Sequence, residues 1–306
     1  MNSNKKKLFF RIVSSVLLFL ISTIMLRAQN ALVLQSDFGT KDGAVASMKG
    51  VAFGVSPQLP IFDLTHEIPA FDIWQAAYRL QQTAPYWPAG TVFVSVVDPG
   101  VGTNRKSVVL KTNSGHYFVS PDNGTLTLVA ESLGITAVRQ IDEKRNRRAD
   151  SWQSHTFHGR DVYAFTGAKL AAGVITFAEV GPLQLPEIFK FAYQKPEFHD
   201  GKLIGNIPIL DVQYGNVWTN IDSSLLSRAG LKKGIRLNVL IHNKDKKMCE
   251  IEAPLVSTFA EVPQGTPLLY VNSLGDLSLA LNMENFAEKY KIGSGADWSI
   301  ELREIK

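Results

Sequence analysis

Three short turns in the first third of the chain each carry an acidic residue beside an apolar run. The acids are Asp37 in SDFG, Asp63 in DLTH and Asp98 in VDPG. In open α/β sheets, ligands bind in the crevice at the carboxyl ends of the strands. A carboxylate there can accept hydrogen bonds from a sugar diol or from a water molecule. Any one of these acids could instead cap a helix or fix its own turn, but three together indicate a site.

Two further side chains add to the chemistry of this half. Arg105 follows Asp98 by seven residues, and His158 stands in TFHGRD at a predicted helix start. A lone histidine is more often structural than functional, so residue types alone assign no role to these side chains. His155 and His158 have the spacing of a metal-binding pair, but the pair precedes the helix and no motif places a third ligand. We therefore predict no metal.

The second half of the chain brings polar and aromatic residues close together. DVQYGNVW holds Asp211, Tyr214, Asn216 and Trp218, and NSLG holds Ser273. Aromatic faces beside an amide suit a purine ring, although the tyrosines and tryptophans of a core look the same in sequence. Residue types and spacing alone predict a small-molecule site between two domains.

The elements that must carry these residues alternate between strands and helices up to about residue 190. We expect strands at 32–34, 59–64, 91–97, 107–111 and 116–119, and helices at 42–53, 71–83 and 159–172. This alternation is typical of a mostly parallel sheet with helices on both faces. The sequence therefore predicts an α/β domain over residues 30–190.

A polar and irregular stretch at 191–204 is the predicted linker to a second domain. Beyond its start we expect strands at 202–212, 235–242, 247–252, 267–271 and 298–302. Few helical patterns separate these strands, which favours a smaller all-β, barrel-like domain over residues 205–306.

The first 28 residues have the layout of a secretory signal. Three lysines precede an apolar run at 12–26, and a small residue follows it. We expect a cleaved signal and an exported, periplasmic protein that makes no membrane contact afterwards; a retained membrane anchor is the alternative. The segment holds five basic residues and no acid, so its removal lowers the formal net charge from +4 to −1. This charge indicates no nucleic-acid partner, and we interpret the basic run at 144–148 as a solvated loop.

Seven motifs occur in series along the chain: SDFGTKDGAVASMKG, DLTHEI, VVDPGVGTNR, PDNG, FHGRD, DVQYGNVWTNI and NSLGDLSLA. Together they resemble the S-adenosyl-L-methionine hydroxide adenosyltransferase family, relatives of the fluorinases and chlorinases, from about residue 32 to the C-terminus. The resemblance implies hydrolysis of S-adenosyl-L-methionine to adenosine and L-methionine without a cofactor. It also implies homotrimers, with each site between the N-terminal domain of one subunit and the C-terminal domain of its neighbour. S-adenosyl-L-methionine is made inside cells, which fits poorly with an export signal.

The resemblance also implies catalytic roles for individual residues. Asp98, Arg105 and His158 match the water-handling triad of the hydroxide-using branch. Halogenating relatives have a tyrosine in place of Asp98 and a halide-binding threonine in place of Val101, so we predict a hydrolase. A halide-using transferase and a nucleoside-binding protein without activity are the alternatives. Whether Asp98 or His158 accepts the proton stays open.

Substrate-binding roles carry over in the same way. Asp37 matches the acid that binds both ribose hydroxyls, and Asn216 matches the amide that reads adenine. The matched groups for the methionine ends are Asp42, Asp211 and Ser273, and those for the apolar walls around adenine are Tyr214, Trp218 and Phe259. Leu281 and Met283 depart from the halogenating relatives, which have arginine and alanine there. Contacts made through the backbone survive such a change.

Overall fold

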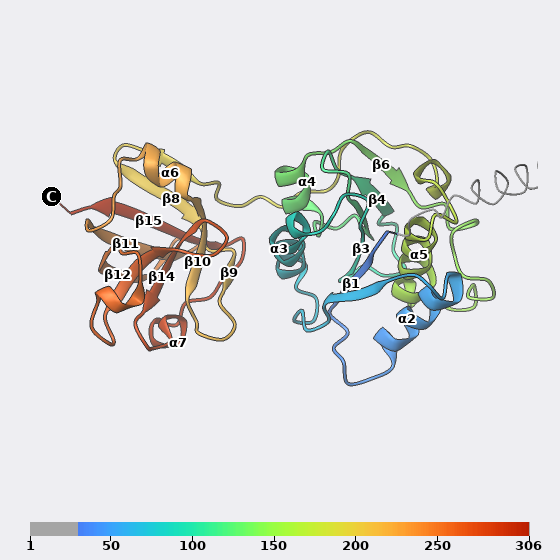
Figure 1. The fold of residues 1–306 in the computed structure, drawn as a ribbon, viewed down its shortest axis with the longest axis horizontal. Helices are drawn as coiled ribbons and strands as arrows, with labels where there is room; N and C mark the ends of the chain where they lie inside the picture. Colours follow the sequence, from blue (N-terminus) through green and yellow to red (C-terminus); the bar gives the residue numbers. More distant parts are fainter. Residues whose placement is uncertain (1–29, 306) are drawn as a thin grey trace, which may run out of the picture.

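The computed structural model describes residues 30–305 of the chain. The elements of its N-terminal half are β1 (Leu32–Ser36), α2 (Ala44–Val55), β2 (Ile61–Thr65), α3 (Ile73–Thr83), η1 (Ala84–Tyr86), β3 (Val92–Val96), β4 (Ser107–Lys111), β5 (Tyr117–Pro121), α4 (Thr127–Leu133), β6 (Ala137–Gln140), η2 (Gly159–Ala164), α5 (Phe165–Ala171) and η3 (Phe177–Val180). The strands form one sheet in the order β2-β1-β3-β5-β4-β6 (Figure 1). β2, β1, β3 and β5 are parallel, whereas β4 pairs with β5 and β6 in the antiparallel sense.

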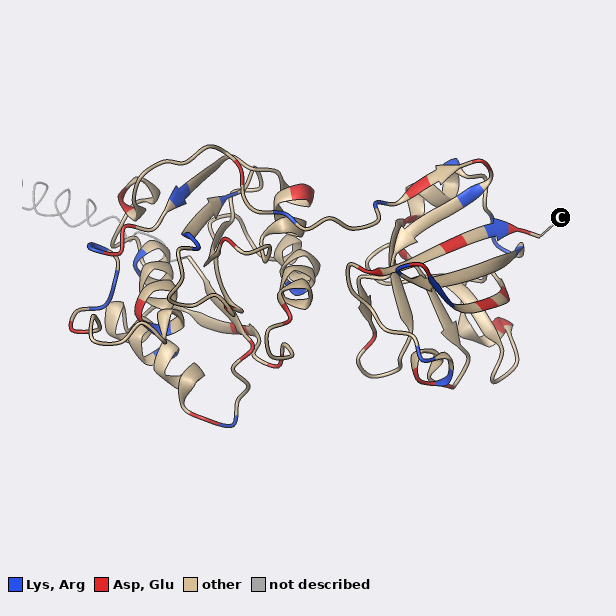
Figure 2. Cartoon of the chain, turned by 180° about the vertical axis from the view of Figure 1, so that it is seen from behind, with Lys and Arg blue, Asp and Glu red and all other residues tan. Residues whose placement is uncertain are grey.

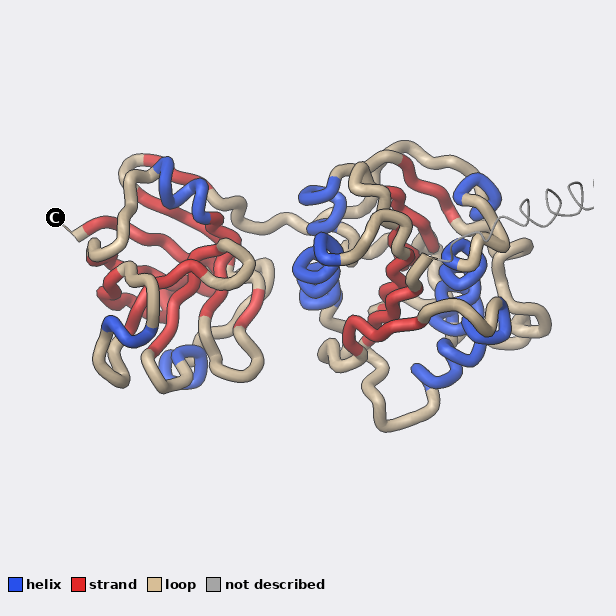
Figure 3. Tube along the Cα trace, in the orientation of Figure 1, coloured by secondary structure: helices blue, strands red, loops and turns tan. Residues whose placement is uncertain are grey.

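Side chains of the central strands alternate between two cores, one on each face of this sheet. Leu32 and Leu34 of β1 pack on the side of Met48 in α2, whereas Val33 packs on the side of Leu80 in α3. Successive residues of a strand point to opposite faces, so a strand that is apolar throughout must be covered on both sides. Figure 3 shows helices on either side of the strands. The predicted α/β architecture is confirmed.

The C-terminal half is built from antiparallel strands. Its elements are β7 (Glu197–His199), β8 (Lys202–Asn206), β9 (Ile209–Leu210), β10 (Val217–Asp222), α6 (Ser223–Arg228), β11 (Arg236–Asn243), β12 (Lys246–Pro254), η4 (Phe259–Glu261), β13 (Pro267–Val271), β14 (Asp276–Leu281), α7 (Phe286–Tyr290) and β15 (Trp298–Glu304). One sheet has the order β13-β14-β10-β9 and the other β12-β11-β15-β8-β7. Their inner faces share one apolar core, to which Val239 and Ile300 contribute from one sheet and Val217 and Leu279 from the other. The predicted all-β half is confirmed.

Some elements differ from the sequence-based expectation. The strand expected at 202–212 is broken into β8 and β9, which belong to different sheets. Pro208 stands between them and has no N–H for a ladder hydrogen bond, so it suits a break. The predicted helix at 159–172 begins as a π-helical turn, η2, before it continues as α5. The short elements α4 and β6 carry too few residues for periodicity to reveal them.

The segment between the two halves packs against the N-terminal half. The rings of Phe191 and Tyr193 lie 6.0 and 5.2 Å from the ring of Trp74 in α3. Trp74 also donates its Nε1 hydrogen to the carbonyl oxygen of Pro208 at 2.9 Å. Ile209 belongs to the same apolar cluster. The halves of one chain are therefore joined by contacts as well as by the chain itself.

The predicted exported, periplasmic location is corrected. Among residues 30–305, no helix is long and apolar enough to cross a membrane. The expected signal at residues 1–28 lies outside the described residues. We therefore assign neither a periplasmic location nor a membrane anchor. Figure 2 shows basic and acidic residues interspersed over both halves.

Candidate active site

The parallel strands bring two of the three predicted acids to one edge of the sheet. β1 lies between β2 and β3, so the turns that follow these strands are neighbours. Asp37 follows β1 directly, and Asp98 lies two residues beyond β3. Asp63 differs from the prediction because it lies within β2. Its carboxylate pairs with Lys49 at 2.6 Å and His66 at 3.0 Å.

The turn after β3 folds Arg105 back onto Asp98. Gly102 has a φ of 79°, in the left-handed region that favours glycine. Arg105 donates from Nε to Oδ1 of Asp98 at 2.8 Å and from Nη2 to Oδ2 at 2.5 Å. Its Nη1 donates to Ser107 Oγ at 3.1 Å, and the guanidinium lies over the ring of Tyr163. This bidentate geometry fixes both partners.

The Asp98–Arg105 pair is largely withdrawn from water. The two side chains are 5% and 11% exposed, respectively. Burial acts to lower the pKa of Arg105, but its hydrogen bonds to Asp98, together with nearby negative charges, outweigh burial and raise the pKa. Arg105 therefore stays protonated, and it can hold an anion or a polarised water but cannot act as a base.

His158 reaches this pair from the start of η2. Arg105 Nη2 lies 3.1 Å from His158 Nδ1 and so bridges the imidazole and the Asp98 carboxylate. Gly159 explains the close approach of η2 to β3. A Cβ built at Gly159 would lie 3.1 Å from the ring of Phe38 and 3.2 Å from Val96. Only glycine fits there without a shift of its neighbours.

The environment of His158 favours its neutral form. Burial, joined by the positive charges of Arg105 and Arg147, lowers the pKa of His158 against the opposing charges of Glu143 and Asp98. A ring that is neutral at physiological pH can accept a hydrogen bond from Arg105. Asp98, Arg105 and His158 thus form one hydrogen-bonded trio, in which His158 is 53 residues from Arg105 in the sequence. We call it the water-handling trio, after the role that the resemblance implies.

A second hydrogen-bonded chain supports the loop that carries Asp37. Ser36 Oγ lies 2.7 Å from His66 Nδ1, and His66 Nε2 lies 3.0 Å from Asp63 Oδ1. The His66 carbonyl oxygen accepts a hydrogen bond from Gly39 N at 2.7 Å. Ser36 is fully buried, so a substrate cannot reach its hydroxyl. This serine–histidine–aspartate arrangement positions the loop and is not a nucleophilic triad.

The remaining predicted residues of the N-terminal half accept hydrogen bonds from backbone N–H groups. Asp37 Oδ2 accepts a hydrogen bond from Phe71 N at 2.9 Å. Asp42 is exposed, and its Oδ1 accepts from Ala44 N at 2.8 Å, at the start of α2. Both carboxylates keep a second oxygen with no hydrogen bond to a described residue, and such an oxygen is available to a ligand.

Three of the predicted adenine-binding residues meet in a cavity of the C-terminal half. This cavity of about 540 Å³ is lined by Gln213, Tyr214, Asn216, Phe259, Tyr270, Leu281, Asn282, Met283, Glu284 and Asn285. Asn216 is buried and Tyr214 is exposed. Leu281 and Met283, where the chain departs from halogenating relatives, line the same cavity. An amide among apolar walls suits a planar heterocycle.

The other predicted residues of this half lie outside that cavity. Trp218 packs in the cluster around Trp74, at the junction of the two halves. Asp211 Oδ1 accepts hydrogen bonds from the backbone of Gln213 and Tyr214 at 3.0 and 3.3 Å. Ser273 is exposed before β14. The side chains of these three residues therefore do not line the cavity, although the backbone N–H of Asp211 donates to the carbonyl oxygen of Asn216 at 2.8 Å.

Two family models together match most of the chain. The SAM hydroxide adenosyltransferase N-terminal domain matches residues 32–181, and the C-terminal domain of the same family matches residues 205–299. The chain belongs to this family. It is 35% identical to an (R)-S-adenosyl-L-methionine hydrolase of Methanocaldococcus jannaschii, over 83% of this chain and 89% of that relative. A fluorinase of Actinoplanes sp. is 31% identical over 86% of this chain and 95% of its own length.

A solved structure of an uncharacterized conserved protein from Thermotoga maritima has the same fold. It is similar with a TM-score of 0.79 and 33% identity, and the match covers 89% of this chain and 99% of that chain. This likeness spans both halves and confirms the two-part fold that the seven motifs predict.

Sequence reasoning missed Arg147, which stands beside His158. The interpretation of the basic run at 144–148 as a solvated loop was wrong for two of its members, because Asn146 and Arg147 are buried. The one local signal was the spacing of Glu143 and Arg147, which are four residues apart and form an ion pair at 2.9 Å. Among residues 30–305, no group of three His, Cys, Asp or Glu side chains is placed to hold a metal ion.

Proposed function

We propose that the protein hydrolyses S-adenosyl-L-methionine to adenosine and L-methionine by attack of water at the 5′ carbon of the adenosyl group. The observation that carries this proposal is the water-handling trio, a buried Asp98–Arg105 pair bridged to His158. Relatives named as (R)-S-adenosyl-L-methionine hydrolases support it. The proposed reaction uses no cofactor and no metal.

The proposed reaction requires the protein to activate the nucleophile. The sulfonium leaves as a neutral thioether, so the leaving group needs no general acid. Water is a poor nucleophile at neutral pH, and a positioned base that takes its proton during attack contributes about 10²–10⁴-fold in rate. In our proposal Arg105 stabilises the developing hydroxide charge, and Asp98 or His158 takes the proton. Alignment of the water with the breaking carbon–sulfur bond adds an orientation effect.

Water is a better candidate than halide as the nucleophile. The Asp98 carboxylate forms an ion pair with Arg105, and its side chain is only 5% exposed. A carboxylate at this position repels an anion that approaches the same pocket. A halide would also have to compete with Asp98 for the guanidinium. We therefore place this chain with the hydrolases of the family and not with the fluorinases.

The substrate roles proposed for other residues follow the division of the chain. Asp37 binds the ribose hydroxyls, and Asn216 reads adenine within the C-terminal cavity. The proposed methionine contacts are Asp42, Asp211 and Ser273, and the proposed apolar walls are Tyr214, Phe259 and Trp218.

We also propose a homotrimer whose sites lie between subunits. The water-handling trio comes only from the N-terminal half, whereas the Asn216 cavity is lined only by residues between 213 and 285. A complete site needs both, and the C-terminal half of a neighbouring subunit would supply the second part. Sedimentation of the full chain tests this assembly, and a monomer that turns over substrate would contradict it.

The test of function is direct. The full chain is incubated with S-adenosyl-L-methionine in chloride-containing and chloride-free buffers, and products are separated by chromatography. Adenosine and methionine in both buffers are expected. A 5′-chloro product that depends on chloride would indicate the halide-using alternative. No product, with adenosine still bound, would indicate a nucleoside-binding protein and refute the proposal.

A further inference from the structure

Arg147 is a buried arginine whose loop is folded around it. Its side chain is fully buried, and its Nη1 donates to Glu143 Oε2 at 2.9 Å. Nε donates to Ser151 Oγ at 3.1 Å, and Nη2 donates to the carbonyl oxygens of Ser151 and Ser154 at 3.2 and 2.8 Å. The ring of Trp152 lies 4.8 Å from its Cζ. A buried guanidinium is costly unless its donors are paired, so this number of partners indicates a defined position.

Arg147 and Arg105 stand at opposite nitrogens of the His158 ring. Arg147 Nη1 is 3.5 Å from Nε2, and Arg105 Nη2 is 3.1 Å from Nδ1. A guanidinium has only donors. A protonated ring would turn an N–H towards each arginine and accept from neither, whereas a neutral ring keeps one lone pair for an arginine hydrogen. The two arginines therefore favour a neutral His158.

The charges around His158 are arranged as two ion pairs. Asp98 and Arg105 come from the turn after β3, and Glu143 and Arg147 come from the segment after β6. Each pair is neutral as a whole, and in each pair the arginine lies within 3.5 Å of a ring nitrogen, while Glu143 exerts the largest opposing charge effect. His155 is a further titratable group beside His158, with ring centroids 6.3 Å apart. Burial, Arg105 and Arg147 act together to lower the pKa of His158, while Glu143 and Asp98 oppose them.

We propose that Arg147 is a positioning residue of the water-handling trio. Paired with Glu143, it keeps His158 neutral, and the single lone pair of the ring accepts from Arg105, which makes the shorter of the two arginine contacts. The ring in turn holds the Arg105 guanidinium, and through it Asp98, in one arrangement for as long as it stays neutral. The catalytic consequence rests on the proposed function, whereas the effect on His158 does not.

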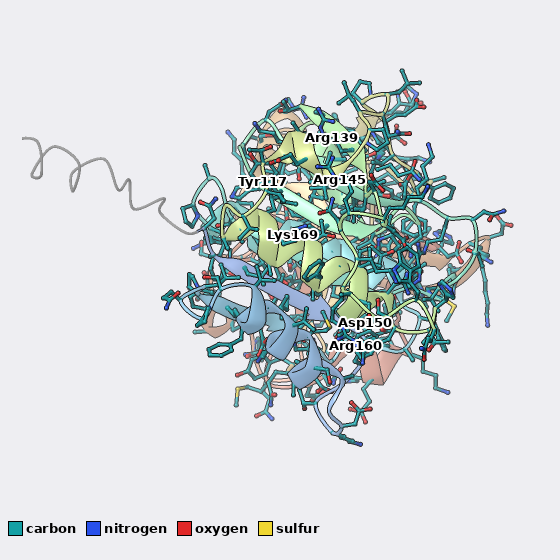
Figure 4. All side chains as sticks on the ribbon, turned by 90° about the vertical axis from the view of Figure 1, so that its right-hand side faces the viewer. Tyr117, Arg139, Arg145, Asp150, Arg160 and Lys169 are labelled. Carbon is teal, nitrogen blue, oxygen red and sulfur yellow. The ribbon has the colours of Figure 1, made fainter. Side chains whose placement is uncertain are left out.

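Substitutions of the two partners must act in opposite directions. Removal of the Arg147 cation by Arg147→Met raises the pKa of His158, because a repulsive charge is lost and Glu143 remains. Removal of the Glu143 anion by Glu143→Gln lowers the pKa further. Arg145→Met is the matched control, since it removes one cation from an exposed position of the same loop. Arg145 is labelled in Figure 4. We expect Arg145→Met to leave the pKa of His158 unchanged.

The measurement is an NMR titration of the imidazole protons in the full chain. The chain has six histidines, and the His158 signal is assigned by its loss in His158→Ala. An upward shift of the titration in Arg147→Met and a downward shift in Glu143→Gln are expected. Shifts of the His158 titration in the same direction in both variants, or no shift in either, would overturn the proposal. Damage to the loop alone would move the titration of both variants in the same direction. If Arg147→Met does not fold, Glu143→Gln decides, and an unchanged or raised titration there refutes the inference.

Turnover supplies the second readout. If His158 returns to the ordinary histidine pKa of about 6.5 in Arg147→Met, about a quarter of it stays neutral at pH 6. The kcat/KM of the variant relative to the wild type then falls about fourfold between pH 8 and pH 6. For Arg145→Met, we expect the ratio of its kcat/KM to that of the wild type to be the same at pH 8 and pH 6. The same result for Arg147→Met would contradict the proposed effect of Arg147 on turnover. A wild type without turnover would refute the proposed function alone, because the NMR titration needs no activity.

Discussion

Asp98→Asn is the substitution that examines the site most directly. The asparagine keeps the shape of the side chain but loses its charge, and its amide turns donors towards the donors of Arg105. In the wild type, the Asp98 carboxylate accepts two hydrogen bonds from Arg105 at 2.8 and 2.5 Å, and only 5% of its side chain is exposed. Breaking a buried pair by removal of one partner costs about 3–5 kcal/mol. Arg105 keeps Ser107 and His158 as partners, so we expect the free energy of unfolding to fall by about 3 kcal/mol, the lower end of this range.

The expected loss of activity is larger than this instability explains. If the Asp98 carboxylate orients or deprotonates the water, turnover falls about 10²–10⁴-fold, while adenosine still binds. Chromatography measures adenosine release, calorimetry measures binding, and urea unfolding measures stability. Asp161→Asn is the matched control. Asp161 is a fully buried carboxylate that pairs with Arg148 and Arg160, so this variant loses stability and keeps turnover in the folded protein.

Unchanged turnover in both Asp98→Asn and His158→Ala would refute the assignment of the trio. Equal losses in Asp98→Asn and Asp161→Asn, each in proportion to the unfolded fraction, would show that Asp98 acts on folding and not on the reaction.

Three further predictions concern other parts of the chain. His66→Ala breaks the chain from Ser36 to Asp63 and loosens the loop of Asp37; the free energy of unfolding falls by about 1–3 kcal/mol, and KM rises more than kcat falls. Asn216→Ala weakens adenosine binding by about 1–3 kcal/mol, as calorimetry would detect. Burial and a neighbouring carboxylate raise the pKa of Asp276 to about 6. The folded state therefore binds the extra proton between about pH 4 and 6, and the wild type loses stability as pH rises through 6. Asp276→Asn avoids this loss and is more stable than the wild type at pH 7 by about 1–2 kcal/mol, after allowance for solvent screening, whereas urea unfolding at pH 4 shows no difference.

Much of the fold follows from local patterns. The apolar runs of β1 and β3 predict strands covered on both faces, and the periodicity after them predicts α2 and α3. Local patterns fail where an element is short or where a break depends on a partner. The strand expected at 202–212 divides at Pro208 because its two parts pair with different sheets. The residue pattern within these eleven residues does not indicate that the two parts join different sheets.

The sequence by itself determined which groups are present and how each turn folds. It supplied the acid of Asp98, the glycine that reverses the chain before Arg105, and the series of motifs that marks the family. Only the tertiary structure decided which of these groups meet. Arg105 and His158 touch because η2 lies against β3, and Arg147 stands at the far side of the ring because a loop that reads as solvated closes over it. Local sequence patterns report contacts within a turn or an element, whereas a buried charge obtains its partners from segments that only the packed core brings together.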